Sequence, residues 1–260
     1  MNDLLTVTDL RAGYGRRNVL QGVSFAVQRG EVCALLGANG SGKSTLLKAV
    51  CGLTDATGGC MLEKTNLWEM PPRRRAQHLG YLAQRSVCAL SLRVLDVVMM
   101  GYNPVLGLLE HPGKEKRRRA EMLLEQLGAG QWTEEDFLSL SEGQRQLVLF
   151  ARTLVRRPEV LLLDEPDSAL DYDNRHRLLQ WLRGYAAREG AGILLCSHDA
   201  NIALRYADRL LLLRDGCLTY DVTVKDADPD ALQRVLSGIY GPVDILCHSG
   251  YFLMTRGERE

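Results

Sequence analysis

Long apolar runs are missing from this chain of 260 residues. No stretch approaches the roughly 20 consecutive apolar residues that a membrane-spanning helix needs. The first residues, Met1-Asn2-Asp3-Leu4, also lack the basic and then apolar layout of a secretion signal. The hydrophobic share of 46% and charged share of 25% are those of a globular domain. We therefore expect one globular chain, with any membrane span carried by another chain.

An excess of charge of one sign is missing as well, because the formal net charge at pH 7 is +0. This balance disfavours nucleic acid or an anionic membrane as the main partner, since both attract proteins through bulk positive charge. The cysteines are odd in number and form no C-x-x-C pair, so we expect reduced structural thiols in a cytosolic protein rather than disulfides or a zinc site. They are Cys33, Cys51, Cys60, Cys88, Cys196, Cys217 and Cys247.

One glycine-rich stretch, residues 31–45, carries the strongest signal for chemistry. An apolar run at 32–36 predicts a buried strand, and a helical pattern follows from Lys43 to Cys51. The turn between them fits G-x-x-x-x-G-K-[ST], whose backbone N–H groups form a nest for phosphates. Lys43 can reach the β- and γ-phosphates, and the Ser44 hydroxyl can bind Mg²⁺. The predicted phosphate-binding residues are Gly37, Asn39, Gly40, Ser41, Gly42, Lys43, Ser44 and Thr45.

A second apolar run, 160–163, leads directly into two carboxylates, Asp164 and Glu165. Ligands bind at the carboxyl ends of strands in open α/β sheets. Asp164 is the natural partner for Mg²⁺, directly or through water, and Glu165 can polarise an attacking water. Alone, such a pair could be a solvated strand end, but together with the glycine-rich turn it indicates nucleotide hydrolysis.

Strand and helix patterns alternate along most of the chain. Short apolar runs predict strands at 4–10, 23–27, 80–84, 160–163, 192–197 and 209–214, and helical spacing predicts helices at 141–157, 174–189 and 200–206. Asp215-Gly216 predicts a hairpin turn, and the tail is expected to hold a helix at 229–240 and strands at 243–247 and 251–255. This order is typical of a mostly parallel sheet with helices on both faces.

The block from Arg85 to Leu138 differs, because strand patterns stop there. Helices are predicted at 93–101 and 114–127, with a loop between them, so the block resembles a helical insertion into an α/β core. Basic runs at 114–119 and 73–75 are interpreted as solvated helix faces. Gly52 and Gly58-Gly59 are interpreted as turns.

The stretch Leu140-Ser141-Glu142-Gly143-Gln144 resembles the signature motif of the ABC transporter ATPases. Tyr14 resembles the family's A-loop aromatic, Gln84 its Q-loop, Ser168 to Asp171 its D-loop and His198 its H-loop, all in the family's order. The resemblance implies a P-loop NTPase (RecA-like) core with an antiparallel β-subdomain and an inserted α-helical subdomain. It implies core segments at 1–84 and 139–220, the insertion at 85–138 and a tail at 221–260.

The resemblance also implies roles for these residues in binding and hydrolysing ATP with Mg²⁺. Tyr14 would stack on adenine, and Gln84, Glu165 and His198 would act at the γ-phosphate, with Gln84 also near the metal. Ser141, Gly143, Gln144 and Asp171 would serve the site of a second copy, paired head to tail. Glu142 and Asp167 depart from the family pattern, in which glycine and threonine or asparagine are usual.

The function implied is the ATPase of an importer at the cytoplasmic face of the inner membrane. Its partners would be two membrane permease subunits and, indirectly, an external substrate-binding protein. Segments 80–84, 197–209 and 211–216 look most like importers of iron(III)–siderophore, haem or vitamin B12, although zinc and manganese importers share several matches. There are two rival classes. One is a soluble ABC ATPase of DNA repair or translation, and the other is a nucleotide-binding regulator that does not hydrolyse ATP. The partner surface is expected at Val97, Val98, Met99, Met100 and Tyr102, unless these form the insertion's own core.

Overall fold

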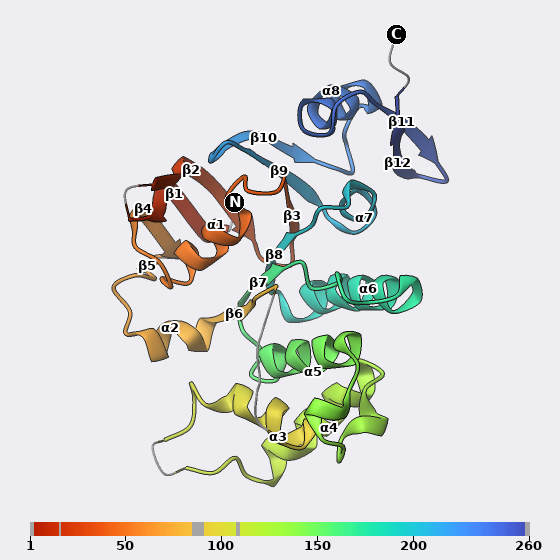
Figure 1. Ribbon diagram of the computed structural model, residues 1–260. Helices are drawn as coiled ribbons and strands as arrows, with labels where there is room; N and C mark the ends of the chain where they lie inside the picture. Colours follow the sequence, from red (N-terminus) through yellow and green to blue (C-terminus); the bar gives the residue numbers. More distant parts are fainter. Residues whose placement is uncertain (1–2, 16, 85–90, 108–109, 258–260) are drawn as a thin grey trace.

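The computed structural model describes residues 3–15, 17–84, 91–107 and 110–257, and its centre is a six-stranded sheet (Figure 1). Its strand order is β10-β9-β3-β8-β7-β6. Neighbouring strands from β9 to β6 pair in parallel, and β10 closes one edge antiparallel to β9. The strands are β3 (Val32–Leu36), β6 (Leu79–Leu82), β7 (Val160–Asp164), β8 (Gly192–Cys196), β9 (Arg209–Arg214) and β10 (Cys217–Thr223).

A four-stranded antiparallel sheet, ordered β2-β1-β4-β5, covers one side of this core. Its strands are β1 (Asp3–Tyr14), β2 (Arg17–Gln28), β4 (Ala56–Leu62) and β5 (Thr65–Asn66). Side chains alternate along β3, so Cys33 and Leu35 pack toward this sheet and helix α1 (Lys43–Val50), whereas Ala34 packs on the opposite side. Both faces of the strand are buried, which explains its unbroken apolar sequence.

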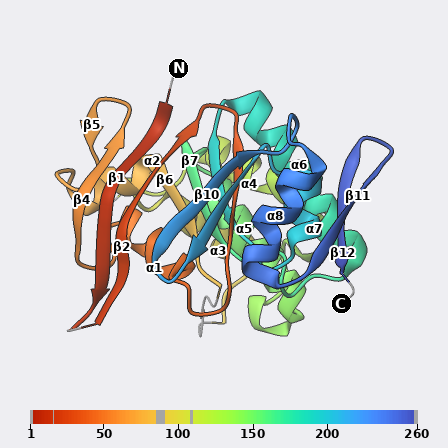
Figure 2. The same ribbon diagram turned by 90° about the horizontal axis from the view of Figure 1, so that it is seen from above.

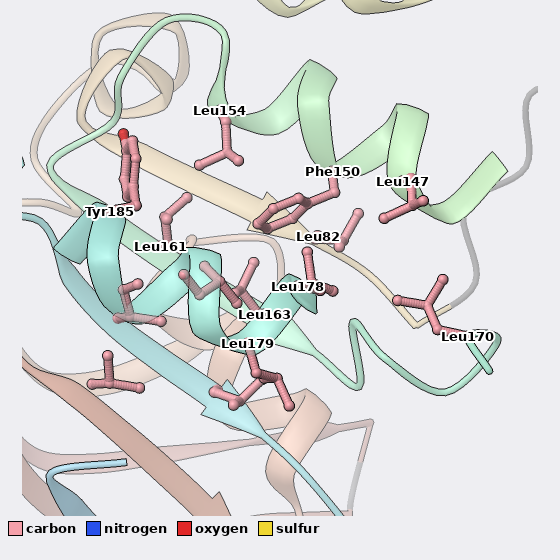
Figure 3. Close-up of a cluster of buried hydrophobic side chains, with 14 of the residues drawn as sticks. Leu82, Leu147, Phe150, Leu154, Leu161, Leu163, Leu170, Leu178, Leu179 and Tyr185 are labelled. Atoms are coloured by element: carbon pink, nitrogen blue, oxygen red, sulfur yellow. The ribbon is translucent and has the colours of Figure 1, made fainter. Parts of the chain in front are cut away.

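Helices cover the opposite face of the central sheet. They are α5 (Glu142–Leu154), α6 (Tyr172–Glu189), α7 (Ala200–Tyr206) and α8 (Pro229–Tyr240). Figure 3 shows Phe150 and Leu154 of α5 meeting Leu161 of β7 and Leu178 of α6. This packing fixes α5 and α6 against the strand that ends in Asp164.

The helical block lies beyond α5, at the bottom of Figure 1. It holds α3 (Val94–Met99), α4 (Lys114–Gln126) and 3₁₀ turns at Met100–Tyr102, Gly130–Trp132 and Phe137–Ser139. Both helices predicted in this block are present. Among the described residues, none of the helices combines the length and the apolar character that a membrane span requires.

One prediction for residues 52–78 is wrong, and another is only partly confirmed. Gly58-Gly59 lies inside β4 rather than in a turn, because Gly58, at φ 108°, accommodates a bulge against Asp9. A Cβ at Gly58 would lie 2.4 Å from the carbonyl oxygen of Asp9. The basic run lies in a helix, α2 (Pro72–His78), with Arg73 and Arg74 exposed as predicted. Arg75 is instead buried and donates to the carbonyl oxygens of Leu67 and Gly52.

The tail forms α8 and a separate two-stranded sheet of β11 (Val243–His248) and β12 (Tyr251–Arg256). Figure 2 shows this hairpin beside α7, at the edge of the molecule. The amide side chain of Asn201 fastens it there, since its Nδ2 donates to the carbonyl oxygen of Met254 and its Oδ1 accepts from the Met254 N–H. The predicted helix and strands of the tail are confirmed.

Candidate nucleotide site

The carboxyl ends of four parallel strands bring the predicted motifs to one edge of the central sheet. The glycine-rich loop follows β3, Gln84 follows β6, Glu165 follows β7 and His198 follows β8. In the sheet β3 neighbours β8, which neighbours β7, which neighbours β6. Residues far apart in sequence therefore meet where ligands bind in such sheets.

A cavity of about 600 Å³ opens at this edge. Its lining joins the loop, the end of the antiparallel sheet and the strand ends: Tyr14, Arg17, Val19, Asn39, Gly40, Gly42, Lys43, Ser44, Thr45, Gln84 and Glu165. Sequence reasoning missed Arg17 and Val19. Both belong to β2, just after the turn beside Tyr14, and because they are two residues apart they share one face of the strand. This alternation of side chains was the sequence signal that could have identified them.

The loop is built to hold an anion. Gly42 has a φ of 111°, which glycine adopts readily. Gly37 is needed for a different reason, because a Cβ there would lie 2.3 Å from the carbonyl oxygen of Leu213. The Lys43 side chain is buried, and its Nζ donates to the carbonyl oxygens of Gly37 at 2.7 Å and Ala38 at 3.2 Å. A buried ammonium thus lies beside the N-terminus of α1, where anions are favoured.

The three residues predicted to act on the γ-phosphate lie in contact. The Gln84 Nε2 donates to the Glu165 Oε2 at 2.8 Å, and the His198 Nδ1 lies 3.6 Å from the same oxygen. The Glu165 side chain is 13% exposed and the His198 side chain 56% exposed. The carboxylate is thus held between an amide and an imidazole at the mouth of the cavity.

Asp164 lies behind Glu165 and is almost fully buried. Burial raises the pKa of its carboxyl group, and a hydrogen bond from the Ser44 hydroxyl opposes that rise. Two hard oxygen ligands thus lie together in a site where added positive charge would be favourable. This donor set fits Mg²⁺.

The signature residues lie elsewhere. The Ser141 hydroxyl caps α5 by accepting a hydrogen bond from the Gln144 N–H, and the Gln144 Oε1 accepts one from the Ser141 N–H. Asp171 caps α6 by accepting from Asn174. Among the described residues, the cavity lining contains none of Ser141, Gly143, Gln144 and Asp171, and α5 and α1 pack on opposite faces of the sheet.

The two departures from the family pattern have different surroundings. Glu142 is exposed in the first turn of α5. Asp167 is only 4% exposed, and its Oδ2 lies 3.2 Å from the Nε of Arg175. The added charge at 142 therefore faces solvent, whereas the charge at 167 is paired inside the protein.

The predicted partner groove is wrong for most of its residues. Val97, Val98 and Tyr102 are buried in the core of the helical block, and Met99 and Met100 are half-buried. Apolar spacing alone could not separate core from surface here. A cavity of about 330 Å³ does lie at Met100, between the block and the core, lined by Tyr81, Leu82, Ala83, Met100, Gly101, Asn103, Pro104, Leu149, Arg152, Thr153 and Arg156.

Comparison with known proteins agrees with this geometry. The family model described as ABC transporter matches residues 20–168. A hemin import ATP-binding protein of Pseudomonas aeruginosa is 40% identical over 222 residues, covering 82% of this chain and 84% of the relative. An Fe(3+) ions import ATP-binding protein of Haemophilus influenzae is 35% identical and covers 83% of this chain. The chain spans 60% of the length of that Fe(3+) relative.

Solved structures with the same fold include a metal-chelate type ABC transporter in an inward-facing conformation, with a TM-score of 0.80, 26% identity and coverage of 97% of this chain and 96% of that one. The ATP binding subunit of an ABC transporter gives a TM-score of 0.78 at 30% identity, covering 90% of this chain and 99% of that one. The predicted fold class and family are confirmed. This chain belongs to the ABC transporter family, as an ATP-binding domain.

Proposed function

We propose that this chain is the ATP-hydrolysing subunit of an ABC importer that takes up an iron chelate, haem or cobalamin. The observation that carries the ATPase proposal is the Glu165 carboxylate, held by Gln84 and His198 beside the phosphate cavity. The names of the relatives, hemin import and Fe(3+) import ATP-binding proteins, support the substrate class.

The site can perform hydrolysis by positioning and charge. Tyr14, 51% exposed at the rim, offers its ring to adenine, and the loop N–H groups with Lys43 hold the phosphates. Glu165 accepts the proton of the attacking water, and His198 holds that water against the γ-phosphate. Ser44 and Asp164 would hold Mg²⁺, which supplies positive charge to the phosphates.

A second copy would complete each site. Ser141 and Gly143 begin α5 with a hydroxyl and an N–H that suit a phosphate, yet they lie outside their own chain's cavity. In a head-to-tail pair each copy would offer these groups, with Gln144 and Asp171, to the other. ATP would then join the two copies, and hydrolysis would release them.

The membrane partners would be two permease subunits, with an external binding protein acting through them, and the chain would lie at the cytoplasmic face of the membrane. The cavity at Met100 is our candidate for the permease contact. Arg73 and Gln77 of α2 donate to the carbonyl oxygen of Pro104, so this loop is braced from the core side. A movement of Gln84 would shift the end of β6, whose Tyr81 and Leu82 also line the cavity at Met100.

Reconstitution tests the proposal. The chain should be purified with the membrane subunit encoded beside it and placed in vesicles, and uptake of iron chelates, haem and cobalamin should be measured with ATP hydrolysis. ATP-dependent uptake of one of these compounds supports the proposal. Hydrolysis with uptake of only zinc, manganese, a sugar or an amino acid would overturn the substrate class. Absence of ATP turnover in the purified complex would overturn the ATPase proposal itself.

A further inference from the structure

Arg175 lies between two carboxylates that come from different segments. Its Nε is 3.2 Å from the Asp167 Oδ2, and its Nη1 is 3.5 Å from the Asp199 Oδ2. The Arg175 side chain is 24% exposed, and that of Asp167 is 6% exposed. The contact with Asp167 is therefore a shielded contact between charges, in which the Nε makes no hydrogen bond among the described residues, and shielding makes it stronger than a surface ion pair. The contact with Asp199 is weaker, because that side chain is 34% exposed.

The two acids adjoin the groups that we assign to hydrolysis. Asp167 follows Glu165 by two residues, and Asp199 follows His198 directly. Arg175 itself lies in the first turn of α6, where its N–H donates to the carbonyl oxygen of Asp171. One guanidinium therefore joins the segments that carry Glu165, His198 and Asp171.

The two carboxylate oxygens of Asp199 have different partners. Its Oδ1 accepts from the N–H groups of Asn201 and Ile202 and so caps α7. Its Oδ2 remains for Arg175. The ion pair is thus separate from the helix cap, and the two can be disturbed separately.

Asp167 needs this cation. Burial raises the pKa of its carboxyl group, and the Arg175 charge is the main opposing influence. Without the guanidinium a carboxylate would remain buried and unpaired, which is strongly unfavourable. The pairing explains how the chain tolerates a buried carboxylate at position 167.

We propose that Arg175 is a positioning residue for ATP hydrolysis. By pairing with Asp167 and Asp199, it keeps Glu165 and His198 in fixed positions relative to each other. The inference rests on the proposed ATPase function. It adds a residue that is not among those lining the nucleotide cavity, and it gives a role to Asp167, which departs from the family pattern.

The first test compares steady-state ATP hydrolysis by the wild-type complex and by Arg175→Met, Arg175→Lys and Arg183→Met. Arg183 is the matched control, since it lies on the same helix in an exposed pair 3.9 Å from Asp208. We expect Arg175→Met to lower kcat about 10- to 100-fold, because misplacement of a catalytic group by about 1 Å can cost 100-fold. The KM for ATP should stay within about threefold, and Arg175→Lys should recover part of kcat because it restores the charge.

A second variant distinguishes loss of the positioning role from loss of folding. The double variant Asp167→Asn with Arg175→Met leaves no unpaired buried charge at 167 and should fold, yet its kcat should remain low. In ¹³C-histidine NMR spectra the His198 signal should move in this variant and stay in place in Arg183→Met. Wild-type kcat in the double variant, or an unmoved His198 signal, would overturn the positioning role. Inactive wild-type complex would instead overturn the proposed function.

Discussion

Glu165 carries an uncommon backbone conformation, with a φ of 51° at a non-glycine residue. Such a conformation costs on the order of 1–3 kcal/mol and persists only where the surroundings enforce it. Here the Glu165 N–H donates to the Cys196 carbonyl oxygen, and Gln84 holds the side chain. The strain is consistent with a residue whose carboxylate must point in one direction.

The substitution Glu165→Gln should separate binding from hydrolysis. The amide keeps an oxygen for Gln84 but cannot accept a proton, so turnover should fall about 10²–10⁴-fold while ATP still binds. Calorimetric titration with ATP and a phosphate-release assay measure the two effects. Glu121→Gln, an exposed glutamate of α4, is the control. Turnover within about threefold of wild type would contradict the role as general base.

Glu142 is a test of how much an exposed charge matters beside the signature. Since it faces solvent at a helix N-terminus, where negative charge is favoured, Glu142→Gly should change ATP hydrolysis only within about threefold. It should also lower the free energy of unfolding by about 1 kcal/mol, the cost of glycine in a helix. A tenfold rise in turnover would show instead that the carboxylate restrains the site.

At the scale of elements, the N-terminus of α1 depends on Lys43. Lys43→Ala should abolish tight binding of Mg-ATP, because the phosphates lose their main cation and the loop loses the contacts to Gly37 and Ala38. Lys48→Ala, in the last turn of the same helix, is the matched control and should bind normally. Unchanged calorimetric affinity in Lys43→Ala would disprove the assignment of the phosphate loop.

The packing of α5 on α6 depends on Phe150, which is fully buried and points toward Leu178 of α6 (Figure 3). Its ring also meets that of Trp181 edge to face, with the centroids 5.8 Å apart. Phe150→Ala should lower the free energy of unfolding by about 3–5 kcal/mol, since the cavity cannot collapse between two packed helices. Urea denaturation followed by tryptophan fluorescence measures the loss. Met122→Ala, at an exposed position of α4, should cost less than about 1 kcal/mol.

Elements with a strong local signal could be predicted from sequence. The bounds of β3, α7, β9 and α8 agree with the predicted runs because apolar patterns, caps and turns all coincide there. By contrast, β4 and the burial of Arg75 in α2 could not be predicted. Glycines at a bulge resemble a turn, and Arg75 is buried only because distant carbonyl groups accept from it.

The same distinction holds for the candidate site. Residues at strand ends were predictable because parallel strands bring their carboxyl ends to one edge. The contact of Arg175 with Asp167 and Asp199 was not, since ion pairs between separate segments leave no periodic pattern. Nor could the sequence decide that Val97 and Val98 face inward, because a core stripe and a docking stripe look alike.

At the scale of the whole molecule, the cavity at Met100 offers a test of assembly. Met100→Glu places a charge in a half-buried cavity between core and helical block, so it should weaken co-purification with the membrane subunit and uncouple uptake. ATP affinity should not change, because Met100 lies outside the nucleotide cavity. Met122→Glu, exposed on α4, is the control. Full assembly and uptake in Met100→Glu would exclude this cavity as the permease contact.

Local stability differs between the separate two-stranded sheet of β11 and β12 and the rest of the molecule. A two-stranded sheet is only marginally stable alone, so the hairpin persists through Asn201 and its packing on α7 and α8. Among the described helices and strands, we therefore expect this hairpin to open first, at a small fraction of the global free energy of unfolding. Its amide protons should exchange with solvent long before those of β3, and a protease should shorten the folded chain from this end.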